Sequence, residues 1–582
     1  MTPFKKIHPL DLPEIRTHLS KFIPTKKDLL SCLCVSQAWH ETFAPLIWST
    51  PSIGHEPYPP GKRLQYANIA GIRRNAHFIR SLRFAFPNFR VNTYAGMRFD
   101  RLDKLASRAH QGTWPVIASL VRNSPVLSEL TIAGLMERLP KREEDALSLW
   151  GAVEEAPMLS TIALKEIDMG GVESTTAFWN ACRRTRGGQG IQVLRLCNVT
   201  FNTIGSEVLV DDYDYNSDEK TKDGGDGEKE KKERKVLISS TMLLPTSNLD
   251  SVVEFELIGY IHSKLTPMDQ LKLQQKLPGV KKLNWGTVVE FKKSGPAFVE
   301  NCLLIFQRLA KKTATTTMPI SSDGVDSCIS SEDRKDEKEE VVWPLVEDLT
   351  LPELAVSDEC LSLMIECLRR PLSRLSVDGS YFGVRSFDRL VGGTIEHCAT
   401  IRVLSLRSCQ GVTSSMVQEI MELCPLLEEL TADGLKFKDV VRGQAWTCVG
   451  LRRLEVFVDV DSGDLDESME NPQKQTLARI GRLQRLEHLS MGRKSYEVVY
   501  SNAIVLRLHA GLEALQGLDR LQSIDLEGSR QEMDRGDVEW MMKHWPRLNY
   551  IRSNICSDSA TRIEVREYLE SRRVNVHYWR PS

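Results

Sequence analysis

Residues 397–430 read HCATIRVLSLRSCQGVTSSMVQEIMELCPLLEEL, and this stretch decides the fold. In its first part Leu404 and Leu406 alternate with polar residues, which indicates a strand with one buried face. Thr413 can then cap a helix. The apolar residues of that helix recur at helical spacing: Val417, Ile420 and Met421. Cys424-Pro425 ends it, so the stretch predicts one strand followed by one helix.

The apolar-x-x-Leu-x-apolar pattern of this strand recurs along the chain. Copies begin at residues 79, 127, 159, 191, 346, 372, 401, 427, 451, 486, 521 and 548. Between 346 and 451 the steps are 26, 29, 26 and 24 residues, the period of a leucine-rich repeat with one strand and one helix per turn. Elsewhere the steps widen, for example to 32–35, and the pattern is least regular over residues 65–290. We therefore expect an irregular α/β solenoid (a horseshoe) rather than a generic α/β sheet protein, which does not repeat at this period.

The first fifty residues show a different pattern, that of three short helices. Pro13 suits a first helical turn, and the three segments carry apolar residues at helical spacing around Leu12 and Ile15, Leu29 and Leu30, and Val35 and Trp39. Isolated helices below about 12–15 residues are marginal at best. The segment must therefore rest on the following domain, on a partner, or on both.

These residues resemble the F-box motif. The match covers residues 8–53 through Leu12-Pro13-Glu14-Ile15, Asp28-Leu29-Leu30, Cys34-Val35, Trp39 and Leu46-Ile47-Trp48. In one departure, Pro13 and Glu14 are adjacent where the motif has a residue between them. Cys398, Cys409 and Cys424 likewise resemble the cysteine-containing repeats found behind many F-boxes.

The resemblance implies docking onto the Skp-family adaptor of an SCF-type cullin-RING ubiquitin ligase. It divides seven residues between the adaptor interface and the module's own packing: Leu12, Pro13, Ile15, Leu29, Leu30, Val35 and Trp39. The alternative is a helical cap that only closes the edge of the solenoid.

The remaining segments complete the expected organisation. A Pro/Gly-rich linker covers residues 54–68, and the solenoid covers 69–582. Two charged segments, 209–237 and 312–341, have too few apolar groups to offset the entropy of ordering and are predicted to be disordered insertions. Residues 560–580 offer a helix and a strand that would cap the last repeat.

Composition argues against several classes of partner. The net charge of -2 does not suit a globally electrostatic partner such as duplex DNA, and aromatic residues do not alternate with basic ones as on an RNA-stacking surface. No stretch of about 18 apolar residues predicts a membrane span, and no apolar segment near Met1 predicts a secretory signal. Thirteen scattered cysteines without a CxxC pair suit reduced thiols. We expect a cytoplasmic or nuclear protein that binds neither nucleic acid nor membrane.

The sequence carries no recognisable catalytic or cofactor signature. Walker-type, GxGxxG and HExxH motifs are absent. Cys32, Cys34 and His40 have no fourth ligand nearby at zinc-finger spacing. We expect no catalytic residues, no metal and no cofactor.

The strand pattern also predicts a target-binding face. Alternation exposes the residues beside the buried leucines, and stacking lines them along the concave side of the solenoid. Mixed charge with an occasional aromatic suits a protein surface better than a phosphate backbone. For any single position the alternative is an ordinary solvated strand residue. The predicted face comprises Arg195, Lys282, Asn284, Arg374, Ser405, Arg407, Glu429, Arg453, Glu455, Phe457, His488 and Asp525.

Together these features predict the non-catalytic substrate-recognition subunit of an SCF-type ligase. The F-box would hold the Skp-family adaptor and, through it, the cullin, while the solenoid holds an unidentified target protein. Its contribution to ubiquitin transfer would be proximity. A ligase-independent leucine-rich-repeat scaffold or protein-interaction module is the alternative.

Overall fold

The computed structural model describes most of the helical module and the repeats. The described residues are 9–23, 25–53, 69–84, 94–108, 113–134, 143–169, 171–184, 190–201, 245, 247–259, 272–287, 343–351, 356–459, 472–492, 504–556 and 558–577. The predicted linker and both predicted insertions lie outside these residues.

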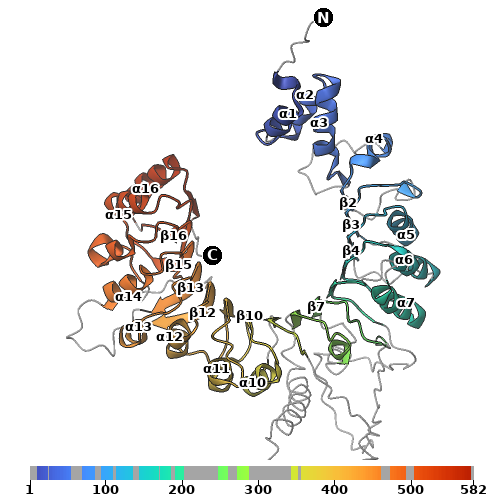
Figure 1. Cartoon of the computed structure of the whole chain (residues 1–582). Helices are drawn as coiled ribbons and strands as arrows, with labels where there is room; N and C mark the ends of the chain where they lie inside the picture. Colours follow the sequence, from blue (N-terminus) through green and yellow to red (C-terminus); the bar gives the residue numbers. More distant parts are fainter. Residues whose placement is uncertain are drawn as a thin grey trace, which may run out of the picture. The chain divides into compact units, whose positions relative to one another are not determined.

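The chain divides into two compact units (Figure 1). The first comprises Met1–Ile191, Asn198–Thr246 and His262–Gln270. The second comprises Gln192–Cys197, Ser247–Ile261 and Leu271–Ser582. The predicted solenoid therefore contributes strands to both units, and each is described separately.

The first unit begins with three helices. After a 3-10 turn at Pro9–Asp11 come α1 (Pro13–Ser20), α2 (Lys26–Leu33) and α3 (Gln37–Trp48). Pro13 occupies the first turn of α1, as predicted, and the side chain of Thr25 caps α2 by accepting a hydrogen bond from the Asp28 N–H. Strand β1 (Ser52–Ile53) follows α3 and pairs in parallel with β2, placing Ser52 opposite Arg83. Sheet hydrogen bonding thus joins the helical module to the first repeats.

Parallel strands and outer helices complete the first unit. The strands β2 to β5 pair in sequence order, with Leu82, Leu105, Leu130 and Ile162 in one buried row. Helices α5, α6 and α7 lie along one side of these strands (Figure 1). They stack through aromatic rings, since Trp150 contacts both Trp114 (6.3 Å between centroids) and Phe178 (4.9 Å). The elements are β2 (Ser81–Phe84), β3 (Lys104–Arg108), β4 (Glu129–Ala133), β5 (Thr161–Lys165), α4 (Ile69–Arg74), α5 (Trp114–Arg122), α6 (Glu143–Glu155), α7 (Val172–Arg183) and a 3-10 turn at Ala76–Phe78.

The second unit repeats the same arrangement at greater length. Its described strands, β6 to β17, pair in parallel and in sequence order. The strands are β6 (Val193–Cys197), β7 (Glu254–Gly259), β8 (Lys282–Thr287), β9 (Asp348–Thr350), β10 (Arg374–Ser376), β11 (Val403–Leu406), β12 (Glu429–Lys436), β13 (Arg453–Asp459), β14 (His488–Ser490), β15 (Ser523–Arg530), β16 (Tyr550–Asn554) and β17 (Asn575–His577).

The helices of the second unit lie outside the strands from β10 onward (Figure 1). They are α10 (Asp358–Cys367), α11 (Val384–Gly392), α12 (Ser414–Leu423), α13 (Phe437–Arg442), α14 (Pro472–Ile480), α15 (Arg535–His544) and α16 (Ser559–Ser571), with 3-10 turns at Leu508–Ala510 and Leu512–Leu515. The stretch 397–430 folds as expected: Leu404 and Leu406 are buried in β11, and Thr413 caps α12 by accepting the Met416 N–H at 3.3 Å.

The predicted α/β solenoid is therefore confirmed. All twelve predicted copies of the pattern contain strands, and α16 with β17 occupies the segment predicted to cap the last repeat. The structure adds β3, β7 and β8, which the sequence analysis did not identify as copies. Their core rows are less regular, because Phe255 and Trp285 replace aliphatic residues and the buried Ser107 lies in register between Phe84 of β2 and Ile132 of β4.

Candidate functional site

The helical module buries a guanidinium and exposes apolar side chains. In α1, Arg16 is only 6 % exposed, and its Nε donates to Thr42 Oγ1 of α3 at 3.1 Å. Its Nη1 is buried without a hydrogen-bond partner among the described residues. Leu12 and Ile15, predicted on the apolar stripe of the same helix, are exposed. Arg16 therefore faces inward while much of the apolar stripe faces solvent.

The exposed apolar residues are concentrated in this module. Seven of the sixteen exposed large hydrophobic residues of the described chain lie here: Leu10, Leu12, Ile15, Phe22, Leu30, Val35 and Leu46. Its fully buried hydrophobic residues are few: Phe43, Ala44 and Ile47. Concentrated exposed apolar side chains mark interaction surfaces in soluble proteins. We call the seven exposed residues the apolar surface of the module.

Most of the residues predicted to bind the adaptor lie on or beside this surface. Pro13 is exposed together with Leu12, Ile15, Leu30 and Val35. Leu29 and Trp39 are half-buried instead. The Trp39 ring stacks on that of Phe43 with centroids 5.2 Å apart, so it takes part in the module's own packing.

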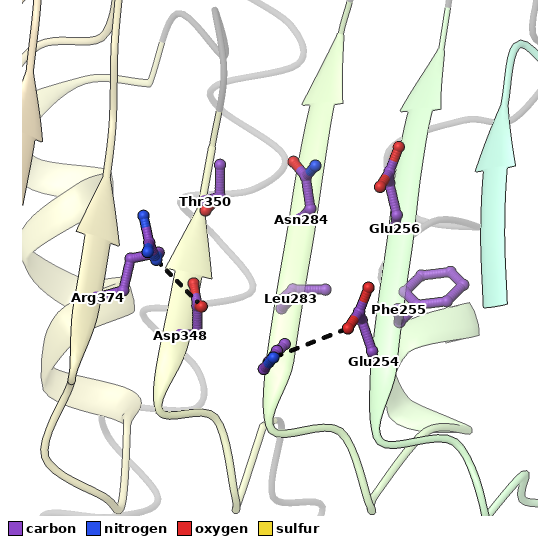
Figure 2. A pocket seen from close by; sticks show the side chains of 9 residues that line it. Glu254, Phe255, Glu256, Leu283, Asn284, Asp348, Thr350 and Arg374 are labelled. Atoms are coloured by element: carbon purple, nitrogen blue, oxygen red, sulfur yellow. Dashed lines mark ion pairs between the residues drawn. The ribbon is translucent and has the colours of Figure 1, made fainter. Parts of the chain in front are cut away.

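In the second unit, the exposed strand positions form a row of alternating charge. Register places Glu254, Lys282, Asp348 and Arg374 side by side on β7 to β10. Lys282 Nζ lies 3.9 Å from Glu254, and Arg374 Nε lies 3.3 Å from Asp348 Oδ2 (Figure 2). The neighbouring Arg195 of β6 places Nη2 2.6 Å from Glu254 Oε1. Much of the charge on this face is thus neutralised internally.

Side chains of these four strands line a hollow of about 350 Å³ (Figure 2). The charged row lines one level of it. A second level, two residues further along each strand, consists of Glu256, Asn284 and Thr350. Burial raises the pKa of Asp348 despite the opposing attraction of Arg374 and Lys282. The Asp348 carboxylate is therefore partly desolvated.

Further along the same unit, Glu455 of β13 gathers two of the predicted arginines. It accepts Arg453 Nη1 at 3.0 Å and also binds Arg407 Nη2 of β11. Nearby, Ser405 Oγ donates to Asp378 Oδ1 at 2.6 Å. The structure thus brings Arg407, Arg453 and Glu455 into one ion-paired cluster.

The other predicted face residues lie on the neighbouring strands. His488 Nδ1 lies 2.7 Å from Ser523 Oγ, and burial, followed by the charge of Arg453, lowers its pKa. Asp525 accepts the Glu527 N–H at 2.9 Å, and Glu429 is half-buried on β12.

Phe457 corrects the prediction of an exposed aromatic on this face. It is only 7 % exposed, and Val456 and Val458 beside it are buried as well. Strands β12 and β13 stay paired as far as Lys436 and Asp459, so β13 runs beyond the alternating part of its pattern. Both faces of the strand are covered there, and the ring belongs to the interior.

Sequence analysis missed the acidic side chains of the hollow. Glu254, Glu256 and Asp348 occupy the same strand positions as the predicted Arg195 and Lys282. The available signal was positional equivalence across repeats. Glu254 and Glu256 were missed because β7 was not recognised as a copy, whereas Asp348 lies in a recognised copy, in register with the predicted Lys282 and Arg374.

Other kinds of site find little support in the described part of the chain. Within it, no group of three or more His, Cys, Asp or Glu side chains is arranged to hold a metal ion. Burial raises the pKa of the Cys367, Cys409 and Cys448 thiols to about 12, which keeps them protonated at neutral pH. None of the described helices is long and apolar enough to span a bilayer.

The fold and surfaces define an α/β leucine-rich-repeat-like solenoid preceded by a three-helix module, an architecture suited to protein interaction. No protein-family model matches the chain, and no curated protein matches it.

Three of the solved structures to which the chain is similar are the following. One is the LRR protein LIC12759 of Leptospira interrogans, with 11% identity, a TM-score of 0.34, and coverage of 88% of this chain and 100% of that one. A second is in the complex of Rad7 and Elc1 in yeast, with 11% identity, a TM-score of 0.35, and coverage of 82% and 79%. The third is in the TLR13–ssRNA13 complex, with 10% identity, a TM-score of 0.34, and coverage of 88% and 63%. At these values the likenesses carry no inference about function.

Proposed function

We propose that this protein is the substrate-recognition subunit of an SCF-type cullin-RING ubiquitin ligase. The α1–α3 module would bind the Skp-family adaptor, and the strand face of the solenoid would bind the target protein. The receptor itself would be non-catalytic, need no cofactor, and act in the cytoplasm or nucleus. Holding a target beside the charged conjugating enzyme raises its effective concentration, and that is the receptor's contribution to transfer.

The inverted burial of α1 is the observation that supports this proposal most. A helical cap that only closed the solenoid would turn its apolar stripe inward, because burial of apolar area is what stabilises such a cap. Here Arg16 is inside, while Leu12 and Ile15 are outside. The F-box resemblance supplies a partner class that would cover such a surface.

The apolar surface allows a quantitative test of docking. Leu30 is 48 % exposed and Val35 is 61 % exposed. Fully burying such side chains contributes about 1.5–3 kcal/mol each, so covering the exposed half contributes about 1 kcal/mol each. Replacing both with aspartate should therefore weaken adaptor binding by about 30-fold or more.

The experiment is a titration of the full-length protein against purified Skp-family adaptor. The double variant Leu30→Asp/Val35→Asp is compared with Leu426→Asp/Val384→Asp, whose parent residues are 47 % and 61 % exposed but lie in the second unit. We expect only the first variant to lose binding. Equal binding by both variants, or no binding by the wild type, would refute docking through this surface.

A ligase-independent scaffold is the second candidate, and the ion-paired strand face favours neither reading. Co-purification of the full-length protein with a cullin separates the two. Recovery of the cullin that depends on Leu30 and Val35 supports the receptor, whereas recovery of other partners without a cullin supports the scaffold.

A further inference from the structure

The hollow over β7 to β10 contains hydrogen-bond acceptors that the fold does not use. Asn284 Oδ1 is buried without a hydrogen-bond partner among the described residues. Glu256 on the adjacent strand forms an ion pair with Arg195, whose Nε lies 3.8 Å away. That distance is too long for a hydrogen bond.

Arg195 does not donate a hydrogen bond to Glu256, because its Nε and Nη2 already donate to Glu254. Its Nε and Nη2 both donate to Glu254 Oε1, at 3.2 and 2.6 Å. Asp348 is similarly paired with Arg374. Both carboxylates of the first level are therefore paired, while at the second level Glu256 has only the 3.8 Å ion pair and no hydrogen bond among the described residues, beside the unfilled amide oxygen of Asn284.

We propose that this hollow receives an arginine side chain of the target protein, whose guanidinium donates to Glu256 and Asn284. Glu256 and Asn284 are in register on adjacent strands, and neighbouring strands lie about 4.8 Å apart. A planar guanidinium carries five N–H donors in a fixed fork and spans two acceptors, whereas a lysine ammonium is a compact point charge. The identity of the occupant as part of a ubiquitylation target rests on the function proposed above.

The size of the hollow agrees with a single side chain. The volume of about 350 Å³ is near the lower limit of the roughly 300–1,000 Å³ found for ligand pockets, so one long side chain fits better than a folded element. The hollow is lined by three carboxylates and two cationic side chains. Arg195, Arg374 and Arg453 already bind carboxylates on this face, so the sheet accommodates guanidinium groups readily.

The probe is N-acetyl-arginine N-methylamide, with its citrulline counterpart as a neutral analogue of the same shape. Binding of both probes to the full-length protein is followed by saturation-transfer difference NMR, which detects weak ligands of a large protein. We expect the arginine probe to bind about tenfold more tightly than the citrulline probe, since only the former makes a charge-assisted hydrogen bond.

Two variants test the assignment, and a third is the control. Glu256→Gln and Asn284→Ala should each weaken binding of the arginine probe. For Glu256→Gln the expected loss of affinity is about tenfold. Glu366→Gln makes the same substitution on α10, where Glu366 is also half-buried and paired with an arginine (Arg389, 3.4 Å) but lies outside the hollow, and it should leave binding unchanged. Absence of binding to the wild type, equal binding of the two probes, or equal binding by wild type and Glu256→Gln would overturn the proposal.

Adaptor binding is measured on the same variants. Glu256→Gln should bind the adaptor as the wild type does. If the arginine probe binds as expected but the wild type binds no adaptor, the ligase function fails while the arginine site stands.

Discussion

His397 lies in the interior of the second unit, where its ring is protected from water and held in one protonation state. It is 2 % exposed, and its Nδ1 accepts the Leu372 N–H at 3.1 Å. Burial lowers its pKa from 6.5 to about 4, against the opposing effect of a hydrogen bond to the Ile365 backbone. A protonated ring could no longer accept the Leu372 N–H, so the start of β10 depends on neutral His397.

The direction of the pH effect follows from the two pKa values. Because the folded pKa is the lower one, the unfolded chain binds the proton more tightly between pH 6.5 and pH 4. Stability is complete above pH 6.5 and decreases as the pH falls toward 4. The loss attributable to His397 is about 2 kcal/mol between pH 7 and pH 5, and about 3 kcal/mol once the pH is below 4.

Replacing His397 with glutamine isolates this contribution. Glutamine can accept the same N–H but does not titrate, so the variant should lack the His397 share of the pH dependence. Hydrogen exchange of peptides from β10 and β11 gives the opening free energy at pH 7 and pH 5 after correction for intrinsic exchange. His577→Gln, at an exposed position on β17, controls for loss of an imidazole. Equal losses in wild type and His397→Gln would refute the reasoning.

Five further outcomes follow from the described contacts. The carboxylate of Asp358 accepts three backbone N–H groups at the start of α11, at 2.8–3.1 Å, so Asp358→Ala should cost about 1–3 kcal/mol in urea unfolding. Hydrogen bonding lowers the pKa of Asp358, although burial opposes this effect. The stability that Asp358 contributes should therefore be present at neutral pH and be lost as the pH falls below 3.8. Urea unfolding of wild type and Asp358→Ala at low pH measures this loss. Thr413→Ala removes the cap of α12 and should cost about 1 kcal/mol, whereas Leu404→Ala in the buried row should cost about 2–5 kcal/mol, both by urea unfolding. Arg16→Met should leave the module's thermal stability unchanged or raised, because the buried guanidinium has no ion pair among the described residues, and a clear loss would contradict this account.

The sequence was most informative where one physical requirement repeats. Leu404 and its equivalents must all face one core, so the same spacing recurs and predicts each strand. The signal weakened at Phe255 and Trp285, because aromatic residues fill the same row without matching the aliphatic pattern.

The site was less predictable, because its contacts join residues far apart in the chain. Arg195 and Glu254 bind each other on neighbouring strands although 59 positions separate them. Alternation predicts that both face outward but not that one neutralises the other. For α1, periodicity predicts an apolar stripe, but it cannot tell whether a stripe faces a core or a partner.

The pairing of β1 with β2 determines how the helical module is oriented on the first repeats. Ser49 O accepts the N–H groups of both Arg80 and Ser81 at 2.9 Å, just before β1 pairs with β2. The helical module is thus attached through backbone hydrogen bonds on either side of residues 54–68. Inserting or deleting glycines in that segment should leave the module's orientation on the first repeats unchanged. The orientation of the module on the first repeats would therefore be fixed by strand pairing and would not depend on the length of the connecting segment.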